Sequence, residues 1–370
     1  MTSQSVSSYK NRRRVIDTIN GTELNSVSID FMDGKVPFDL ECVRNYGFWC
    51  TEDESKKDNL RDREITNYPE AIEEFGKNGI HVIPRFVIGS DSFLSEIDGG
   101  KYAVKEGSKP TRFVDLNSKV VRRYKKDVIL ESMEKVKEWT EKGLGHPLPR
   151  DTRICKLDFI RFPDGYDGDK PYNAVNKMIE EIRDALPSDI RLELCLYGCA
   201  FHDSEEFRRE KLSNGQIVED IREIMSRGDI FSMMAYSYLY RYYEQRWADV
   251  GAHIKKERNA VEKMIKGYDI DNVLSIQGSL GPDVSKEYLK AHRVSHARFL
   301  QNQISECEGQ YHVWNGGIKE NTHALHAALF NVPESTWAKI EAHEEGTNLA
   351  KELSNDLIVD RIVTPVQGLD

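Results

Sequence analysis

The chain has 370 residues, of which 39% are hydrophobic and 9% aromatic, enough for a large packed core, which excludes a disordered chain. Its formal net charge is −10 and its pI is near 5.6, which argues against general affinity for nucleic acid, because such binding depends on dense lysine and arginine. The length exceeds that of one ordinary compact domain.

The N-terminal residues 1–23 contain a short basic run, "KNRRR", which we expect to be a solvated arm. No apolar signal-peptide core precedes it, and no stretch of about 18 apolar residues occurs in the chain. We therefore expect a soluble, cytoplasmic protein without a membrane partner.

The cysteines are far apart or lie inside expected strands, and none has the CxxC spacing of a zinc site or a redox pair. We interpret them as reduced packing residues and expect no metal and no cofactor. The six are Cys42, Cys50, Cys155, Cys195, Cys199 and Cys307.

Short β-rich runs recur along the chain, each followed by a longer segment with helical periodicity, a pattern that predicts a parallel sheet covered by helices. Eight such units favour a closed (β/α)8 TIM barrel as a single α/β domain over residues 24–330. The expected strands are 26–31, 80–88, 112–116, 153–160, 190–198, 229–236, 272–277 and 311–315.

Two segments, 32–67 and 89–111, offer little clear helix and are expected to be long βα loops at the mouth of the barrel. After the barrel, residues 331–370 predict a C-terminal helical extension.

Alternation along the fourth and fifth strands indicates which side chains face the barrel interior. In "KLDFI" the apolar Leu157 and Phe159 should face the helices, which turns Lys156 and Asp158 inward. In "LELCLY" the three leucines, 192, 194 and 196, should face outward, which turns Glu193, Cys195 and Tyr197 inward.

Buried charges need partners, because removing one member of a buried pair costs about 3–5 kcal/mol. Glu193 is therefore either the ion-pair partner of Lys156 on the neighbouring strand or a catalytic carboxyl group. Asp158 is either paired structurally with Arg161 or Arg85, or the central carboxylate of a site.

Chemistry in such barrels collects at the carboxyl ends of the strands. Polar and aromatic residues at these ends suit a polyhydroxylated ligand, with carboxylates and amides for hydroxyl groups and an aromatic face for a sugar ring. The expected ring consists of Asp30, Arg85, Asp115, Arg161, Tyr197, Tyr236, Gln277, Trp314 and Asn315.

The runs "IHVIPRFVIGSD", "LDFIRFPDGY" and "YHVWNGG" make the chain resemble a family of putative glycosyl hydrolase barrels, a domain of unknown function related to the α-amylase-like barrels. The resemblance covers roughly residues 24–330. It implies a barrel acting on glycans, with Asp158 at the position of the strand-four nucleophile. Where the family tends to have an acid late in strand five, this sequence has Cys195.

The leading hypothesis is a glycoside hydrolase that cleaves an oligo- or polysaccharide with two carboxyl groups. Asp158 would attack or stabilise the anomeric carbon, and Arg161 or Arg85 would keep it ionised. The general acid is left open between Glu193 and Asp203 in "CAFHDSEEF".

Two alternatives compete with it. One is a catalytically inactive barrel that binds a glycan or a protein partner. The other is a metal-dependent hydrolase, which predicts His-x-His on the first strand; that strand instead ends "SIDF", and His81 and His312 fall early in their strands. The sequence does not predict the oligomeric state.

Overall fold

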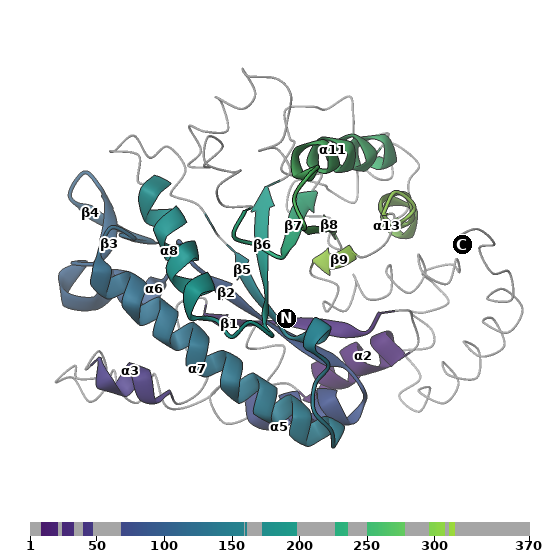
Figure 1. The fold of residues 1–370 in the computed structure, drawn as a ribbon, viewed down its shortest axis with the longest axis horizontal. Helices are drawn as coiled ribbons and strands as arrows, with labels where there is room; N and C mark the ends of the chain where they lie inside the picture. The colour runs from purple at the N-terminus through teal and green to yellow at the C-terminus, as the bar shows by residue number, and fades with distance from the viewer. Residues whose placement is uncertain are drawn as a thin grey trace, which may run out of the picture.

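The computed structural model describes residues 9–20, 24–32, 40–46, 68–158, 160, 172–197, 226–235, 250–277, 296–307 and 311–314. Its centre is a parallel seven-stranded sheet in the order β1-β2-β5-β6-β7-β8-β9 (Figure 1). The strands are β1 (Ser26–Met32), β2 (His81–Val87), β5 (Ile154–Asp158), β6 (Arg191–Tyr197), β7 (Ile230–Ala235), β8 (Asp271–Gln277) and β9 (Tyr311–Trp314).

Helices precede and connect these strands along the chain. They are α2 (Tyr9–Asn20), α3 (Glu41–Asn45), α5 (Tyr68–Lys77), α6 (Ser92–Glu96), α7 (Lys119–Leu144), α8 (Tyr172–Ala185), α11 (Val250–Ile265) and α13 (His296–Ile304). The long α7 packs against α3, α5, α8 and β2. Of the helices in the described part of the chain, none is long and apolar enough to cross a membrane.

The sequence of α7 explains both its length and its place. Ser118 caps the first turn by accepting the Val121 N–H, and Gly145 ends the helix with a φ of 75°, a conformation that glycine adopts readily. Buried side chains recur every three or four residues and form one apolar face, which includes Val121, Val128 and Val136.

The sheet is curled. A side chain of β9 contacts one of β6, because the His312 Nε2 lies 3.2 Å from Glu193 Oε1. In a flat sheet three strand spacings would separate these strands by about 14 Å. The sheet therefore curves so strongly that side chains on the inner faces of β6 and β9 come into contact.

The two faces of the sheet differ as alternation predicts. Leu157, together with leucines 192, 194 and 196, belongs to the core cluster shared with Val128 of α7 and Ile179 of α8. The alternating positions carry Lys156, Asp158 and Glu193, which contact other charged side chains instead. The outward prediction is confirmed for these four leucines, while Phe159 lies outside the described residues.

Seven of the eight predicted strands belong to this sheet, and the prediction for 112–116 is wrong. Residues 109–114 form β4 (Lys109–Val114), which pairs antiparallel with β3 (Ala103–Glu106) in a separate two-stranded sheet. Because β2 pairs directly with β5, no barrel strand lies between them. In the described part of the chain β9 and β1 do not pair, so the observed sheet is a curled half-barrel.

The long loops predicted at 32–67 and 89–111 are confirmed in part. The segment 88–116 is an excursion that contains α6, the 3-10 turn Ile97–Gly99 and the β3–β4 hairpin. Of 33–67, only Leu40 to Tyr46 is described, with α3 inside it.

The expectation of a solvated N-terminal arm is wrong where the structure describes it. Residues 9–20 form α2, whose Val15, Ile16 and Ile19 are buried in the core. Arg12 is also buried and pairs with Glu74 of α5 at 2.8 Å. The predicted extension 331–370 lies outside the described residues.

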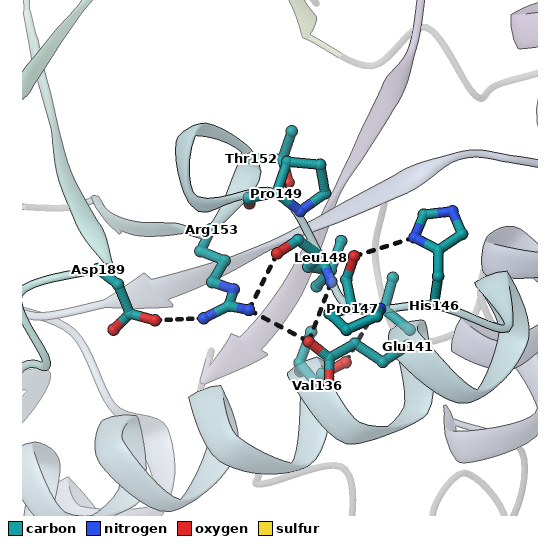
Figure 2. A network of polar contacts seen from close by, with 10 residues as sticks. Val136, Glu141, His146, Pro147, Leu148, Pro149, Thr152, Arg153 and Asp189 are labelled. Carbon is teal, nitrogen blue, oxygen red and sulfur yellow. Dashed lines mark hydrogen bonds and ion pairs between the residues drawn. The ribbon is translucent and has the colours of Figure 1, made fainter.

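At the amino ends of β5 and β6, ion pairs connect α7 to the turns that lead into these strands. Arg153, just before β5, donates to the Leu148 carbonyl at 2.9 Å, contacts Glu141 of α7 at 3.3 Å and pairs with Asp189 before β6 (Figure 2). Glu141 also accepts the Leu148 N–H at 3.0 Å. These contacts fix the turns that enter β5 and β6, far along the strands from their carboxyl ends.

Candidate active site

Three charged side chains meet near the carboxyl ends of β1, β2 and β5, and we call them the strand-end cluster: Asp30, Arg85 and Asp158. Arg85 Nη1 lies 2.5 Å from Asp30 Oδ1, and its Nε and Nη2 both lie 2.6 Å from Asp158 Oδ2. The register of the strands produces these contacts. Asp30 is paired directly with Arg85, and Asp158 is paired with Val87, two residues beyond Arg85 on β2, so Arg85 lies diagonally across from Asp158. One guanidinium thus holds a carboxylate on each neighbouring strand.

The strand-end cluster is mostly, but not fully, buried. The exposed fractions of the side chains are 19% for Asp30, 15% for Arg85 and 8% for Asp158. Burial alone would lower the pKa of Arg85, but Asp158 and then Asp30 raise that pKa well above its ordinary value. Arg85 is therefore a permanent cation that orients two carboxylates.

A second group, which we call the buried triad, lies deeper on the inner face: Lys156, Glu193 and His312. Lys156 Nζ lies 2.6 Å from Glu193 Oε1, and His312 Nε2 approaches the same oxygen from β9. The exposed fractions are 6% for Lys156, 1% for Glu193 and 24% for His312. The predicted Lys156–Glu193 ion pair is thus present.

The triad holds Glu193 as an anion. Burial alone would raise the pKa of Glu193, but Lys156 and then His312 lower it well below its usual range. Burial acts in the opposite direction on Lys156, and Glu193 overcomes it and raises the pKa of that ammonium. A carboxyl group that releases its proton so readily is poorly suited to deliver a proton at neutral pH.

Cys195 is buried on the inner face of β6, two residues after Glu193. Burial raises the pKa of its thiol, and the negative charge of Asp158 raises it further. Cys195 is therefore a neutral thiol near the strand-end cluster, and it supplies no charge there.

The remaining predicted residues divide into three groups. Asp115 follows β4, outside the seven-stranded sheet, and its carboxylate accepts the Asn117 N–H at 2.9 Å, so its expected place at a barrel strand end is wrong. Tyr197, Gln277 and Trp314 are the last residues of β6, β8 and β9, and only their backbone is described. Outside the described residues lie Arg161, Asp203, Tyr236 and Asn315.

Sequence reasoning missed His312 as a partner of Glu193. The sequence carries no local signal for this contact, because β9 is three strands from β6 in the sheet and His312 reaches Glu193 only where the sheet curls. Within the described ranges no group of three His, Cys, Asp or Glu residues is arranged to hold a metal ion. In the strand-end cluster, Arg85 occupies the position between the two carboxylates.

A curled parallel sheet covered by helices, with carboxylates at the carboxyl ends of its strands, is the architecture of barrel-type enzymes. This chain belongs to the family described as "Putative glycosyl hydrolase domain", which matches residues 1–295. Among proteins of curated function, no sequence matches the chain.

A solved structure with a TM-score above 0.5 supports the barrel-type fold. The chain is similar to the endo-1,4-β-D-mannanase of Thermotoga petrophila, with a TM-score of 0.53 and 12% identity over 85% of each chain. It also matches the PgaB (BpsB) glycoside hydrolase domain of Bordetella bronchiseptica (TM-score 0.47, 11% identity, 86% of this chain and 93% of that one). A hypothetical protein of Ruminiclostridium thermocellum matches with 23% identity and a TM-score of 0.39 over 52% of this chain and 95% of that one.

Proposed function

We propose that this chain is a glycoside hydrolase that cleaves a glycosidic bond in an oligo- or polysaccharide at the carboxyl ends of β1, β2 and β5. The observation that carries the proposal is the strand-end cluster, in which Arg85 orients Asp158 and Asp30 together. Family membership supports a glycan-related, hydrolase-like function, and the barrel-type fold agrees with it.

The chemistry assigned to the cluster follows from the transition state of glycoside hydrolysis, which resembles an oxocarbenium ion. Asp158, as an anion, attacks or stabilises the anomeric carbon. Arg85 fixes its orientation through two contacts to one oxygen. Asp30, on the other side of Arg85, binds a sugar hydroxyl.

The proton donor is a separate assignment. Because its pKa is lowered and its side chain is buried, Glu193 suits a supporting role better than that of general acid. We assign the general acid to Asp203. For contacts to the sugar rings we propose Arg161, Tyr197, Tyr236, Gln277, Trp314 and Asn315.

The fold belongs to the proposal as well. A closed (β/α)8 barrel needs one more strand, and β2 and β5 already pair with each other. We propose that the barrel closes between β9 and β1, because every other neighbouring pair of strands in the sheet is already hydrogen-bonded.

A second candidate is a catalytically inactive barrel that binds a glycan or a protein partner. It is favoured by one observation: among the described inner-face residues of the sheet, no carboxyl group is suited to donate a proton, since Glu193 is held as an anion by Lys156.

The test is hydrolysis of a panel of polysaccharides by the purified protein, followed by reducing-end release and product analysis, with Asp158→Asn as the matched control. Hydrolysis by the wild type and not by the control supports the hydrolase. Glycan binding by both proteins without hydrolysis by either supports the inactive barrel. Equal hydrolysis by both would refute the assignment of Asp158.

A further inference from the structure

Lys125 of α7 is a fully buried cation that the proposed reaction does not use. Its side chain is 0% exposed, and its Nζ lies 3.1 Å from the Val87 carbonyl oxygen and 3.1 Å from Asp91 Oδ2. Asp91 is itself 3% exposed. Because an isolated buried ammonium is costly, these two contacts account for its presence beneath the end of β2.

The carbonyl that Lys125 binds lies where strand pairing stops. The last β1–β2 pair joins Met32 to Phe86, so Val87 lies just beyond it. On the other side of β2, Val87 is paired with Asp158, and the Ile88 N–H donates to the Asp158 carbonyl at 2.9 Å. Lys125 thus holds β2 at the level of Asp158.

The acidic partner of Lys125 lies at the base of the excursion 88–116. Asp91 Oδ1 accepts the Leu94 N–H at 2.9 Å and caps α6, while the Asp91 N–H donates to the Arg112 carbonyl at 2.8 Å. Two residues earlier, Gly89 accepts the Val114 N–H at 3.0 Å. One ammonium therefore connects α7 and the end of β2 with the base of the excursion, where segments 89–91 and 112–114 are hydrogen-bonded to each other.

We propose that Lys125 is a positioning residue of the candidate active site. It fixes the backbone at the carboxyl end of β2, and through the Val87–Asp158 register it aligns Arg85 with Asp158, while Asp91 holds the excursion beside them. The effect on turnover rests on the proposed function; the effect on the backbone does not.

If the Lys125–Asp91 ion pair were only structural, restoring stability would also restore activity. Variants that remove the charges of both residues therefore distinguish a structural role from a positioning role. Lys125→Met leaves Asp91 as an unpaired buried anion, so the fold should be destabilised. Adding Asp91→Asn removes that charge but keeps an oxygen that can cap α6. The double variant should therefore regain most of the lost melting temperature without regaining the contact to Val87.

In the double variant we expect kcat to stay at least about tenfold below the wild-type value with little change in KM, because misplaced reacting groups lower the rate of the chemical step. We also expect backbone amides in residues 86–96 to exchange hydrogen about tenfold faster, since local opening there becomes easier. The matched control is Arg153→Met, which removes partly buried ion pairs at the opposite end of the strands (Figure 2). It should lower the melting temperature but leave kcat and the exchange of 86–96 unchanged.

Hydrogen exchange keeps the two proposals distinguishable. If the wild type hydrolyses nothing on the panel and 86–96 still opens in the double variant, the proposed function fails and the positioning stands. Wild-type exchange of 86–96 in the double variant overturns the positioning, whatever the activity. Wild-type kcat in the double variant, or an equal loss of kcat in Arg153→Met, also overturns it.

Discussion

In the strand-end cluster one cation serves two carboxylates, whereas in the buried triad one carboxylate serves two basic groups. Arg85 contacts Asp30 and Asp158, and Glu193 contacts Lys156 and His312. Both groups lie on the inner face of the same sheet, and Asp158 follows Lys156 by only two residues on β5.

The two groups differ in their balance of acidic and basic side chains. Two carboxylates against one guanidinium give the strand-end cluster a net negative charge, which suits a transition state that develops positive charge on the sugar ring. In the triad the single carboxylate is matched by Lys156 alone and is also contacted by His312. Under the proposed function, the first group carries the chemistry and the second holds strands together.

The sharpest way to break this comparison is Asp158→Asn. The variant nearly preserves the shape of the side chain but removes its negative charge, so glycan hydrolysis should fall at least about a thousandfold, as expected when a catalytic group is lost. The melting temperature should stay within a few degrees of the wild-type value. Hydrolysis near the wild-type rate would make Asp158 a structural residue like Glu193.

Glu193→Gln tests the other side of the comparison. It leaves the Lys156 ammonium buried without its counter-ion, so the free energy of unfolding should fall by about 3–5 kcal/mol in denaturant titrations. Lys156→Met combined with Glu193→Gln should recover part of that loss. A stable Glu193→Gln protein that has lost only turnover would instead identify Glu193 as the general acid.

The triad also predicts a dependence of stability on pH. The pKa of Glu193 is lowered on folding from an ordinary value of 4.5, so its contribution is complete above that value and is lost as the pH falls through the folded-state pKa. The difference in unfolding free energy between wild type and Glu193→Gln should be constant near neutral pH and shrink toward about pH 3. A difference that grows on acidification would contradict the lowered pKa.

The smallest effect is expected from His312→Leu. His312 is more exposed than Lys156 and lies farther from Glu193, so its loss should lower the free energy of unfolding by at most about 1 kcal/mol, the usual upper value for a solvent-accessible charged contact. Denaturant titration beside Glu193→Gln measures it. A larger loss than in Glu193→Gln would make His312, and not Lys156, the main partner of that carboxylate.

Local sequence patterns predicted the seven strands of the sheet, because the signal lies in alternation and in the turns that bound each strand. The same alternation placed Lys156 beside Glu193 and the leucines of β6 in the core. It could not say with which strand 112–116 pairs, since a hairpin and a barrel strand share the pattern and pairing is a long-range property.

Other contacts escaped prediction for the same reason. His312 reaches Glu193 only because the sheet curls, and Lys125 reaches Asp91 only because α7 crosses the end of β2. At the N-terminus the basic run masked the apolar Val15, Ile16 and Ile19, which share one side of α2. The contacts of Arg85 with two carboxylates likewise depend on the register of three strands.

The base of the excursion 88–116 has a consequence for protein engineering. The segments 89–91 and 112–114, where the excursion leaves and rejoins the fold, lie side by side. They are joined by hydrogen bonds from the Val114 N–H to the Gly89 carbonyl and from the Asp91 N–H to the Arg112 carbonyl. A replacement segment would therefore bridge a short gap, and the entropy of closing a loop rises only slowly with its length. The exposed tip of the β3–β4 hairpin, from Glu106 to Lys109, is the place where segments of other lengths can be grafted, since Tyr102 and Val114 at its base belong to the core cluster.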